Sequence, residues 1–456
     1  MKLRRSPSIT LAIVLAGTAM YGQKSMSRQT MPGITAQSKP ARMQAPGWTL
    51  NQIEALARRR NPTLRQVRAY ELAAAGKLRQ AGLWPNPSVG YEGDQIRGGS
   101  FGGGEQGVFA RQTIELGGKL AAARQVARAG VRRAAVADAA QVQAVAAAVR
   151  LGFYHALLRQ REIAMARALA ANAAAAYRTT LQLANVGQAD RADELQARIA
   201  AGQARLRLAQ ARARARTAWR ELAAVTGDAE LRPGPLRGHL RPRRSLPRRP
   251  AYLATLLRRA PAVRLAQTGL ARAAARLTQA GRQSIPNLSL RGGIQTNREL
   301  ISPHGPVVGW QEFASAGIGL PLWNRNQGNR AAARAELTAA REELTRVRLL
   351  LRRRAARVWA RYRAAQLAVR QYARLLPLAR QAYQLLRHDY RNMAAAYPQV
   401  LMAQRSWYEL EMKNLRQTAR LRDYAVRLES QMNFRGLHTT RPQPTPVMEN
   451  PPYVQP

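Results

Sequence analysis

The sequence of 456 residues contains no cysteine, few aromatic residues (6%) and only five histidines. Without cysteine the chain can form neither disulfides nor thiolate metal sites, and it cannot carry a lipid anchor on an N-terminal cysteine. The histidines and the eleven methionines lack the spacing of metal ligands. Neither a phosphate-binding loop nor a catalytic nucleophile motif is present. The sequence therefore predicts no metal site, no cofactor and no enzymatic reaction.

Acidic residues are also scarce, and the formal net charge is +49. Nucleic acid is the obvious partner for a chain with such a charge. The arginines are spread along the whole chain, however, and their abundance beside alanine also fits a composition bias of the genome. A basic coiled-coil protein that binds nucleic acid is therefore kept as an alternative of another class.

The N-terminal residues 1–22 are expected to be a secretory signal peptide. Met1–Arg5 is positively charged, Ile9–Ala16 is a short apolar core, and Gly17–Gly22 supplies small residues for cleavage. Residues 23–47 are expected to be a disordered spacer. No later stretch has the run of about 18 apolar residues that a membrane helix needs, so no membrane helix is expected in the exported chain.

The remaining sequence is a tandem duplication. Two pairs of aligned segments share one offset of 199 residues, and a third pair has an offset of 210, so the second copy contains additional residues between these landmarks. The aligned pairs are Ala55–Ala69 with Ala254–Thr268, Ala81–Gly90 with Ala280–Ser289, and Gly117–Arg124 with Gln327–Arg334.

Between these landmarks, polar and apolar residues alternate with period two, which predicts β-strands. Each segment has about ten residues, the length of a tilted strand that crosses a bilayer. Two hairpins are predicted, at about 86–116 and about 286–322. Four strands cannot close a barrel alone. If the strands cross a membrane, several chains must therefore share one barrel. A half-buried hairpin in a soluble domain is the alternative. The alternating segments are Ser88–Asp94, Val108–Leu116, Leu288–Gln295 and Ala314–Leu322.

A long helix is predicted after each hairpin, and a return helix follows each long helix. At about 1.5 Å per residue, some 60 to 65 helical residues reach roughly 90 to 100 Å. Leu337, Leu344, Leu351 and Val358 recur at intervals of seven and indicate a coiled-coil seam. The predicted helices are Gly118 to about Leu183, Arg191 to Thr226, Gly328 to about Asp389, and Gln399 to Asn433.

These features together resemble the TolC-like outer-membrane efflux proteins, most specifically in the tip sequence VGQADRADELQAR (186–198). The junction PLWNRNQGNRAAARAEL (321–337) is similar to that of the CzcC-like, heavy-metal-efflux branch. The resemblance covers about 48–433. It divides the chain into a first repeat (48–226), a linker (227–250), a second repeat (251–433) and a disordered, proline-rich tail (434–456).

The resemblance implies a mainly α fold with a β-barrel part. Three identical chains would share a twelve-stranded barrel in the outer membrane of a Gram-negative type bacterium, in contact with its lipid, and their helices would form a tunnel through the periplasm. A periplasmic adaptor would connect this passive duct to an inner-membrane pump of the resistance-nodulation-division type. The implied cargo is heavy-metal cations. The same duct serving drugs, organic solutes or type I secretion is the closer alternative, because specificity resides mostly in the pump and adaptor.

The resemblance also places the adaptor at the two periplasmic tips. Gly187 occupies the position of the family's tip glycine, eight residues before Leu195, whereas the corresponding residue before Leu401 is Met393. A glycine there permits a tight left-handed turn, so the first tip is expected to be the better docking site. The tip residues are Val186, Gly187, Gln188 and Ala189 in the first copy, and Asn392, Met393, Ala394 and Ala395 in the second.

Polar links at the helix ends close the entrance in this family. Asp193 and Tyr390 match two linking positions, but Ala395 stands where the family has an arginine, so a weak link is expected. The alternative is that Asp193 only stabilises a helix N-terminus. Gln399 and Met402 replace the aspartates that narrow the pore in some relatives. The mouth is therefore expected to be less selective for cations than in those relatives.

The junction between the last strand and the second long helix is expected to be a structural turn. Pro321 ends the strand because it cannot donate a ladder hydrogen bond. Asn324, Asn326 and Gly328 are then expected to turn the chain into the helix.

Overall fold

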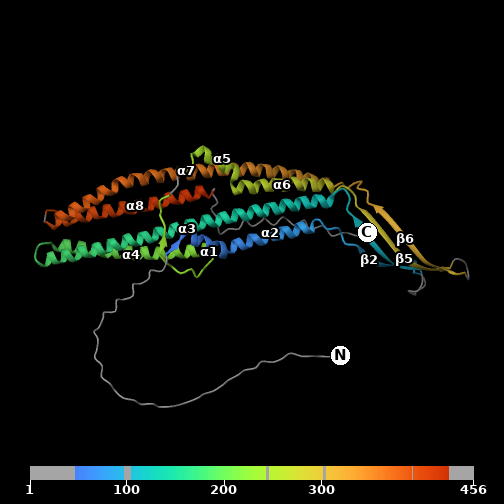
Figure 1. Ribbon diagram of the computed structural model, residues 1–456, viewed down its shortest axis with the longest axis horizontal. Coiled ribbons are helices and arrows are strands. Elements are labelled where there is room, and N and C mark those ends of the chain that lie inside the picture. Colours follow the sequence, from blue (N-terminus) through green and yellow to red (C-terminus); the bar gives the residue numbers. More distant parts are fainter. Residues whose placement is uncertain (1–46, 97–103, 243–245, 301–304, 393, 431–456) are drawn as a thin grey trace, which may run out of the picture. The chain divides into compact units, whose positions relative to one another are not determined.

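The computed structural model describes most of both repeats. The expected signal peptide, the spacer up to residue 46, the tail at 434–456 and Met393 lie outside the described residues. Within them the chain is mainly helical, with one four-stranded sheet (Figure 1). The described ranges are 47–96, 104–242, 246–300, 305–392 and 394–430.

The same order of elements occurs twice, as the aligned segments predict. Two short strands, β1 (Trp48–Thr49) and β4 (Leu236–Arg237), pair in parallel and attach the linker to the start of the first repeat. The first repeat comprises α1 (Leu50–Arg60), α2 (Pro62–Gln80), β2 (Ser88–Asp94), β3 (Glu105–Ile114), α3 (Lys119–Asn185) and α4 (Arg191–Thr226). The second comprises α5 (Arg249–Arg259), α6 (Pro261–Arg282), β5 (Leu288–Leu300), β6 (Val307–Ile318), α7 (Gln327–Arg391) and α8 (Tyr397–Glu429).

The long helices α3 and α7 contain 67 and 65 residues. Each is therefore about 100 Å long. Helix α3 packs along α4, α7 packs along α8, and α6 contacts both α3 and α7 (Figure 1). Many of the buried residues in α3 and α4 are alanines, whose small side chains let the helix axes approach closely.

The coiled-coil seam predicted in α7 is confirmed. Leu351 and Ala365 are buried in a core cluster that joins α5, α7 and α8, and Leu344 and Val358 pack against the same cluster. Among the described residues, α3 is the one helix long and apolar enough to cross a membrane by length and composition, with an 18-residue window of mean hydropathy 1.2 that is 33% buried. This helix packs against α2, α4 and α6, so it is part of a helix bundle.

The four-stranded sheet has the order β2-β3-β5-β6, and every neighbouring pair is antiparallel. The central pair, β3 and β5, joins the two repeats. Strand β2 has the predicted bounds, but β3 begins at Glu105 instead of Val108, and β5 continues to Leu300. The alternation in the sequence underestimates the length of these strands, because backbone hydrogen bonds continue through polar residues near the loops. Strand β6 likewise begins earlier than predicted and ends at Ile318, before Pro321.

Candidate functional site

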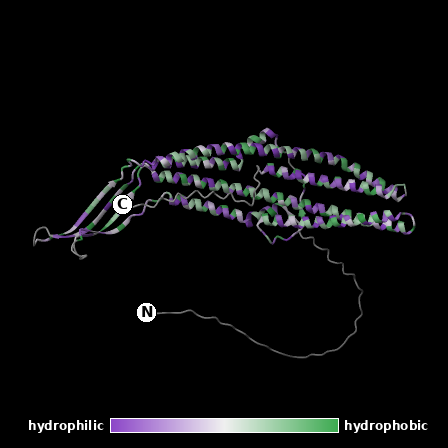
Figure 2. Ribbon diagram, turned by 180° about the vertical axis from the view of Figure 1, so that it is seen from behind, coloured by the Kyte–Doolittle hydropathy of each residue, from purple (hydrophilic) through white to green (hydrophobic). Residues whose placement is uncertain are grey.

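One face of the sheet is mostly apolar and exposed to its surroundings, although Glu312 of β6 also lies on it, opposite Ile294. The strand register places Val89 and Trp310 on this face, and their side chains are 84% and 75% exposed. Green and purple residues alternate along the strands in Figure 2. An exposed apolar surface of this size indicates a binding or membrane-contacting surface. The face includes Val89, Tyr91, Val108, Ile294, Trp310 and Ile318.

The opposite face of the sheet is polar and contains an arginine pair. Arg111 and Arg291 face each other across β3 and β5. Arg291 forms an ion pair with Glu92, and its guanidinium lies 4.3 Å from the Phe109 ring centroid. These contacts offset the repulsion between two like charges directly opposite each other. The face therefore keeps charged groups beside aromatic rings.

The two edge strands, β2 and β6, have free outer edges in the described part of the chain. An unpaired edge exposes backbone N–H and C=O groups that can pair with another strand. Because the sheet is antiparallel throughout and has an even number of strands, β6 of one copy can pair with β2 of the next and continue the same alternation.

The first helical tip, between α3 and α4, closes with a glycine in the left-handed conformation. Gly187 has a φ of 75°, and the Gln188 N–H donates to the Leu183 carbonyl at 2.8 Å. An added Cβ at Gly187 would meet no atom within 4 Å. The requirement for glycine here is therefore one of backbone conformation. Val186 beside it is 67% exposed, so the tip presents an apolar side chain to its surroundings.

The second tip, between α7 and α8, closes through an equivalent backbone bond. The Ala394 N–H donates to the Asp389 carbonyl at 2.8 Å, and the Asn392 N–H donates to the same carbonyl at 3.1 Å. Ala394 is exposed and Ala395 half-buried. Since Met393 lies outside the described residues, the expected advantage of the first tip stays a prediction.

Tyr397 lies at the second tip, at the start of α8, and is a residue that the sequence reasoning missed. Tyr397 is buried, and its ring centroid lies 5.7 Å from that of Tyr390. Burial raises the pKa of Tyr397 to about 12, with smaller contributions from Tyr390 and Asp193. Burial and the neighbouring Asp190 also raise the pKa of Asp193. An aromatic residue just before Pro398, at the start of a return helix, was the available signal.

No hydrogen bond joins Asp193 to Tyr390 within the described ranges, and the buried Tyr390 hydroxyl has no hydrogen-bond partner there. The expected direct link between these two side chains stays a prediction. Tyr390 packs against Tyr397, and Asp193 contributes to the raised pKa of Tyr397. Gln399 and Met402, on the first turns of α8, are exposed.

The junction into α7 is made by Asn324 and Asn326. Asn326 has a φ of 58°, an uncommon conformation for a residue other than glycine. Its backbone N–H donates to the Asn324 Oδ1 at 3.1 Å, and its Nδ2 donates to the Ala280 carbonyl at 2.8 Å. Gly328 lies within α7 as its second residue, so the helix begins earlier than expected. The corresponding junction into α3 uses Gly118, with a φ of 71°.

Two ionic contacts that sequence reasoning also missed connect the repeats. Glu162 of α3 is 2% exposed, and it accepts from Arg159 Nη1 at 2.7 Å and from Arg416 Nε of α8 at 3.1 Å. His155 of α3 and Asp423 of α8 are 2.7 Å apart. The hydrogen bond with Asp423 raises the pKa of His155. These pairs fasten the first repeat to the return helix of the second.

A sequence profile described as outer membrane efflux protein matches residues 54–228 and 253–433, which is most of the chain. The chain belongs to the outer membrane efflux protein family. Each of the two matches corresponds to one copy of the duplicated unit. The family and fold are those of outer-membrane channels and not of enzymes.

Individual outer membrane efflux proteins are similar over most of their length. The cobalt-zinc-cadmium resistance protein CzcC of Cupriavidus metallidurans is 28% identical over 346 residues, which cover 75% of this chain and 79% of that protein. The solved structure of CusC has a TM-score of 0.71 at 19% identity, and covers 86% of this chain and 96% of that one. VceC from Vibrio cholerae has a TM-score of 0.68 at 18% identity, with 84% and 96% covered.

This outer membrane efflux protein is accordingly a channel component of a tripartite efflux system in the outer membrane of a Gram-negative bacterium. Members of the family work with adaptor proteins and inner-membrane pumps. The coiled-coil helices fit that role, because they extend the chain far from its sheet.

Proposed function

We propose that three copies of this chain join their sheets edge to edge in one twelve-stranded barrel, and that heavy-metal cations leave the cell through it. The observation that carries the proposal is an amphipathic sheet with two free edges. A membrane-spanning sheet must satisfy every backbone group, and only closure into a barrel removes its edges. The apolar face then contacts lipid, and the polar face lines the channel.

The exposed aromatic residues support a membrane position. Trp84, between α2 and β2, and Trp323, between β6 and α7, are 57% and 86% exposed. Tyr91 and Trp310 lie further along the strands on the apolar face. Tryptophan and tyrosine are enriched at the two boundaries of transmembrane barrels.

The helices of the three copies form the periplasmic part of the duct. A periplasmic adaptor docks at the tips, principally at Val186–Ala189, and links the duct to an inner-membrane pump of the resistance-nodulation-division type. Asp193 and Tyr390 help to hold the entrance closed, and Tyr397 positions Tyr390 through the packing of their rings. The closed tip at Gly187 and the cluster around Tyr397 support these assignments.

Support for a metal cargo comes from the similarity to CzcC, whose name assigns it to cobalt, zinc and cadmium resistance. The test is deletion of the gene from its host, with growth measured on zinc, cobalt, cadmium and a panel of organic compounds. Increased sensitivity to the metals alone, reversed by the wild-type gene, is expected. Sensitivity confined to the organic compounds would overturn the metal assignment and leave the barrel proposal intact.

A further inference from the structure

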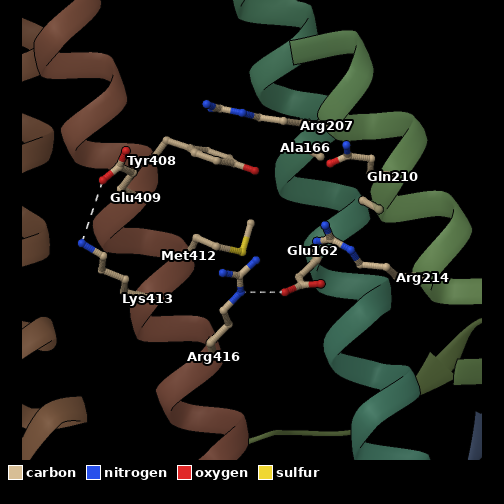
Figure 3. A pocket seen from close by; sticks show the side chains of 11 residues that line it. Glu162, Ala166, Arg207, Gln210, Arg214, Tyr408, Glu409, Met412, Lys413 and Arg416 are labelled. Carbon is tan, nitrogen blue, oxygen red and sulfur yellow. Dashed lines mark hydrogen bonds and ion pairs between the residues drawn. The ribbon is translucent and has the colours of Figure 1, made fainter. Parts of the chain in front are cut away.

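A pocket of about 360 Å³ lies between the α3–α4 pair of the first repeat and α8 of the second. Figure 3 shows Arg207 and Gln210 of α4 on one side and Tyr408, Met412 and Arg416 of α8 on the other. Helix α3 packs against both α4 and α8 and contributes the base of the pocket. The pocket therefore forms where the two repeats meet.

Both carboxylates that line the pocket already have cationic partners. Glu162, at the base, is shared by Arg159 and Arg416. Glu409 lies 3.9 Å from Lys413 on the same helix. Neither carboxylate is left to neutralise the remaining cations of the lining.

The basic side chains that α4 contributes to the pocket differ from these carboxylates, because they lack ion-pair partners in the described part of the chain. Arg207 and Arg214 line the pocket, and neither has an ion-pair partner among the residues that the structure describes. The Arg207 guanidinium instead lies 5.8 Å from the centroid of the Tyr408 ring. Arginine remains charged at every physiological pH, so the two guanidinium groups present uncompensated positive charge to the pocket.

Further hydrogen-bond donors surround these arginines. Burial raises the pKa of Tyr408, so its phenol stays protonated and can donate. The Gln210 amide lines the same space. Arg416 donates to Glu162 through Nε, and a guanidinium has five N–H donors in all. The donors come from two helices that belong to different repeats.

We propose that this pocket binds a small polyvalent oxyanion of the phosphate class, held by Arg207 and Arg214 of α4 and Arg416 of α8. Guanidinium groups match the geometry of phosphate oxygens and form charge-assisted hydrogen bonds with them. A monovalent halide can use fewer of these donors, so the site favours polyvalent oxyanions over chloride. The pocket has room for the anion together with bound water.

The bound anion bridges the repeats, because it offsets repulsion between basic side chains on α4 and α8. Anything that binds the folded state stabilises it. This inference goes beyond the transport of cargo and does not depend on which compound the duct exports.

The first experiment measures the binding of radiolabelled inorganic phosphate to the full-length, detergent-solubilised protein by equilibrium dialysis, at constant ionic strength in chloride. The test variant is Arg207→Gln/Arg214→Gln. The matched control is Arg205→Gln/Arg212→Gln, which removes the same charge from exposed positions of the same helix outside the pocket. Arg214→Gln alone serves as a milder second variant.

Saturable binding at one phosphate per chain is expected for the wild type and the control. The double variant should bind at least about tenfold more weakly, as expected from the loss of charge-assisted bonds. Phosphate should also raise the thermal midpoint of the wild type and the control but not that of the double variant. Absence of saturable binding, or an equal loss in variant and control, would overturn the proposal.

Discussion

Replacement of Gly187 by leucine tests the role of the first tip. The residue has a φ of 75°, and the tip is closed by the bonds from Gln188 to Leu183 and from Gly187 to Ala184, at 2.8 and 3.1 Å. A side chain in the left-handed conformation costs roughly 1 to 2 kcal/mol. No steric clash adds to this cost, because an added Cβ meets nothing within 4 Å.

This strain energy is small compared with the stability of the whole protein but large compared with the stability of the closed tip. The long helices keep their packed cores, so the thermal midpoint should change little. If the adaptor binds only the closed tip, a strain of about 1.4 kcal/mol weakens docking about tenfold. The affinity of the purified adaptor for the detergent-solubilised channel, measured by biolayer interferometry, gives this change directly.

Two variants separate backbone strain from other effects. Gly202 lies in α4, is exposed, and an added Cβ there also meets nothing within 4 Å. Gly202→Leu should bind the adaptor like the wild type. Gly187→Asn should lose less affinity than Gly187→Leu, because asparagine tolerates the left-handed conformation better. Wild-type affinity in Gly187→Leu would refute the assignment of docking to this tip.

Three other predictions concern different parts of the chain. The pKa of His155 is raised above 6.5 by its bond to Asp423, so the pair contributes its full stability below about pH 6.5 and loses it as the pH rises through the folded-state value. The difference in thermal midpoint between wild type and His155→Gln should therefore shrink from acidic to alkaline pH; a constant difference would contradict this. Asn326→Ala should destabilise the protein by about 2 kcal/mol, through left-handed strain and the lost hydrogen bond to Ala280. Asn326→Gly should destabilise it less, because glycine avoids the strain. Calorimetric thermal midpoints of the two variants provide the check, and equal effects would argue against strain. At the mouth, single-channel recording should show little block of the wild type by divalent cations, and Gln399→Asp/Met402→Asp should introduce such block; strong block of the wild type would count against the expected weak selectivity.

The helices were predictable because their signals are local, although α8 runs from Tyr397 to Glu429 instead of from about Gln399 to Asn433. The return helix α4 has the bounds that the sequence predicts, Arg191–Thr226, since a tip glycine precedes it and Gly227 follows it. The duplication was predictable for the same reason, because aligned segments need no knowledge of contacts. The start of α7 differed from the prediction because the alignment with Gly118 pointed to Gly328, whereas Asn326 adopts the left-handed conformation.

Contacts between the repeats could not be predicted in the same way. The pairing of β3 with β5 connects residues separated by 174 to 192 positions, and alternation within a strand does not specify its neighbour. The burial of Tyr397 against Tyr390 depends on how α7 and α8 pack at their tip. The placement of Glu162 between Arg159 and Arg416 likewise requires α3 and α8 to be side by side. Among so many arginines, no sequence pattern marks the one that pairs.

The shared barrel is tested most directly by the mass of the complex in the outer membrane. Membranes of the native host are fractionated, and the detergent-solubilised protein is analysed by native mass spectrometry before and after heating. A heat-modifiable assembly of three chains in the outer-membrane fraction is predicted. A soluble monomer or dimer would contradict the edge-to-edge closure of the sheets and would make the basic coiled-coil alternative the better explanation.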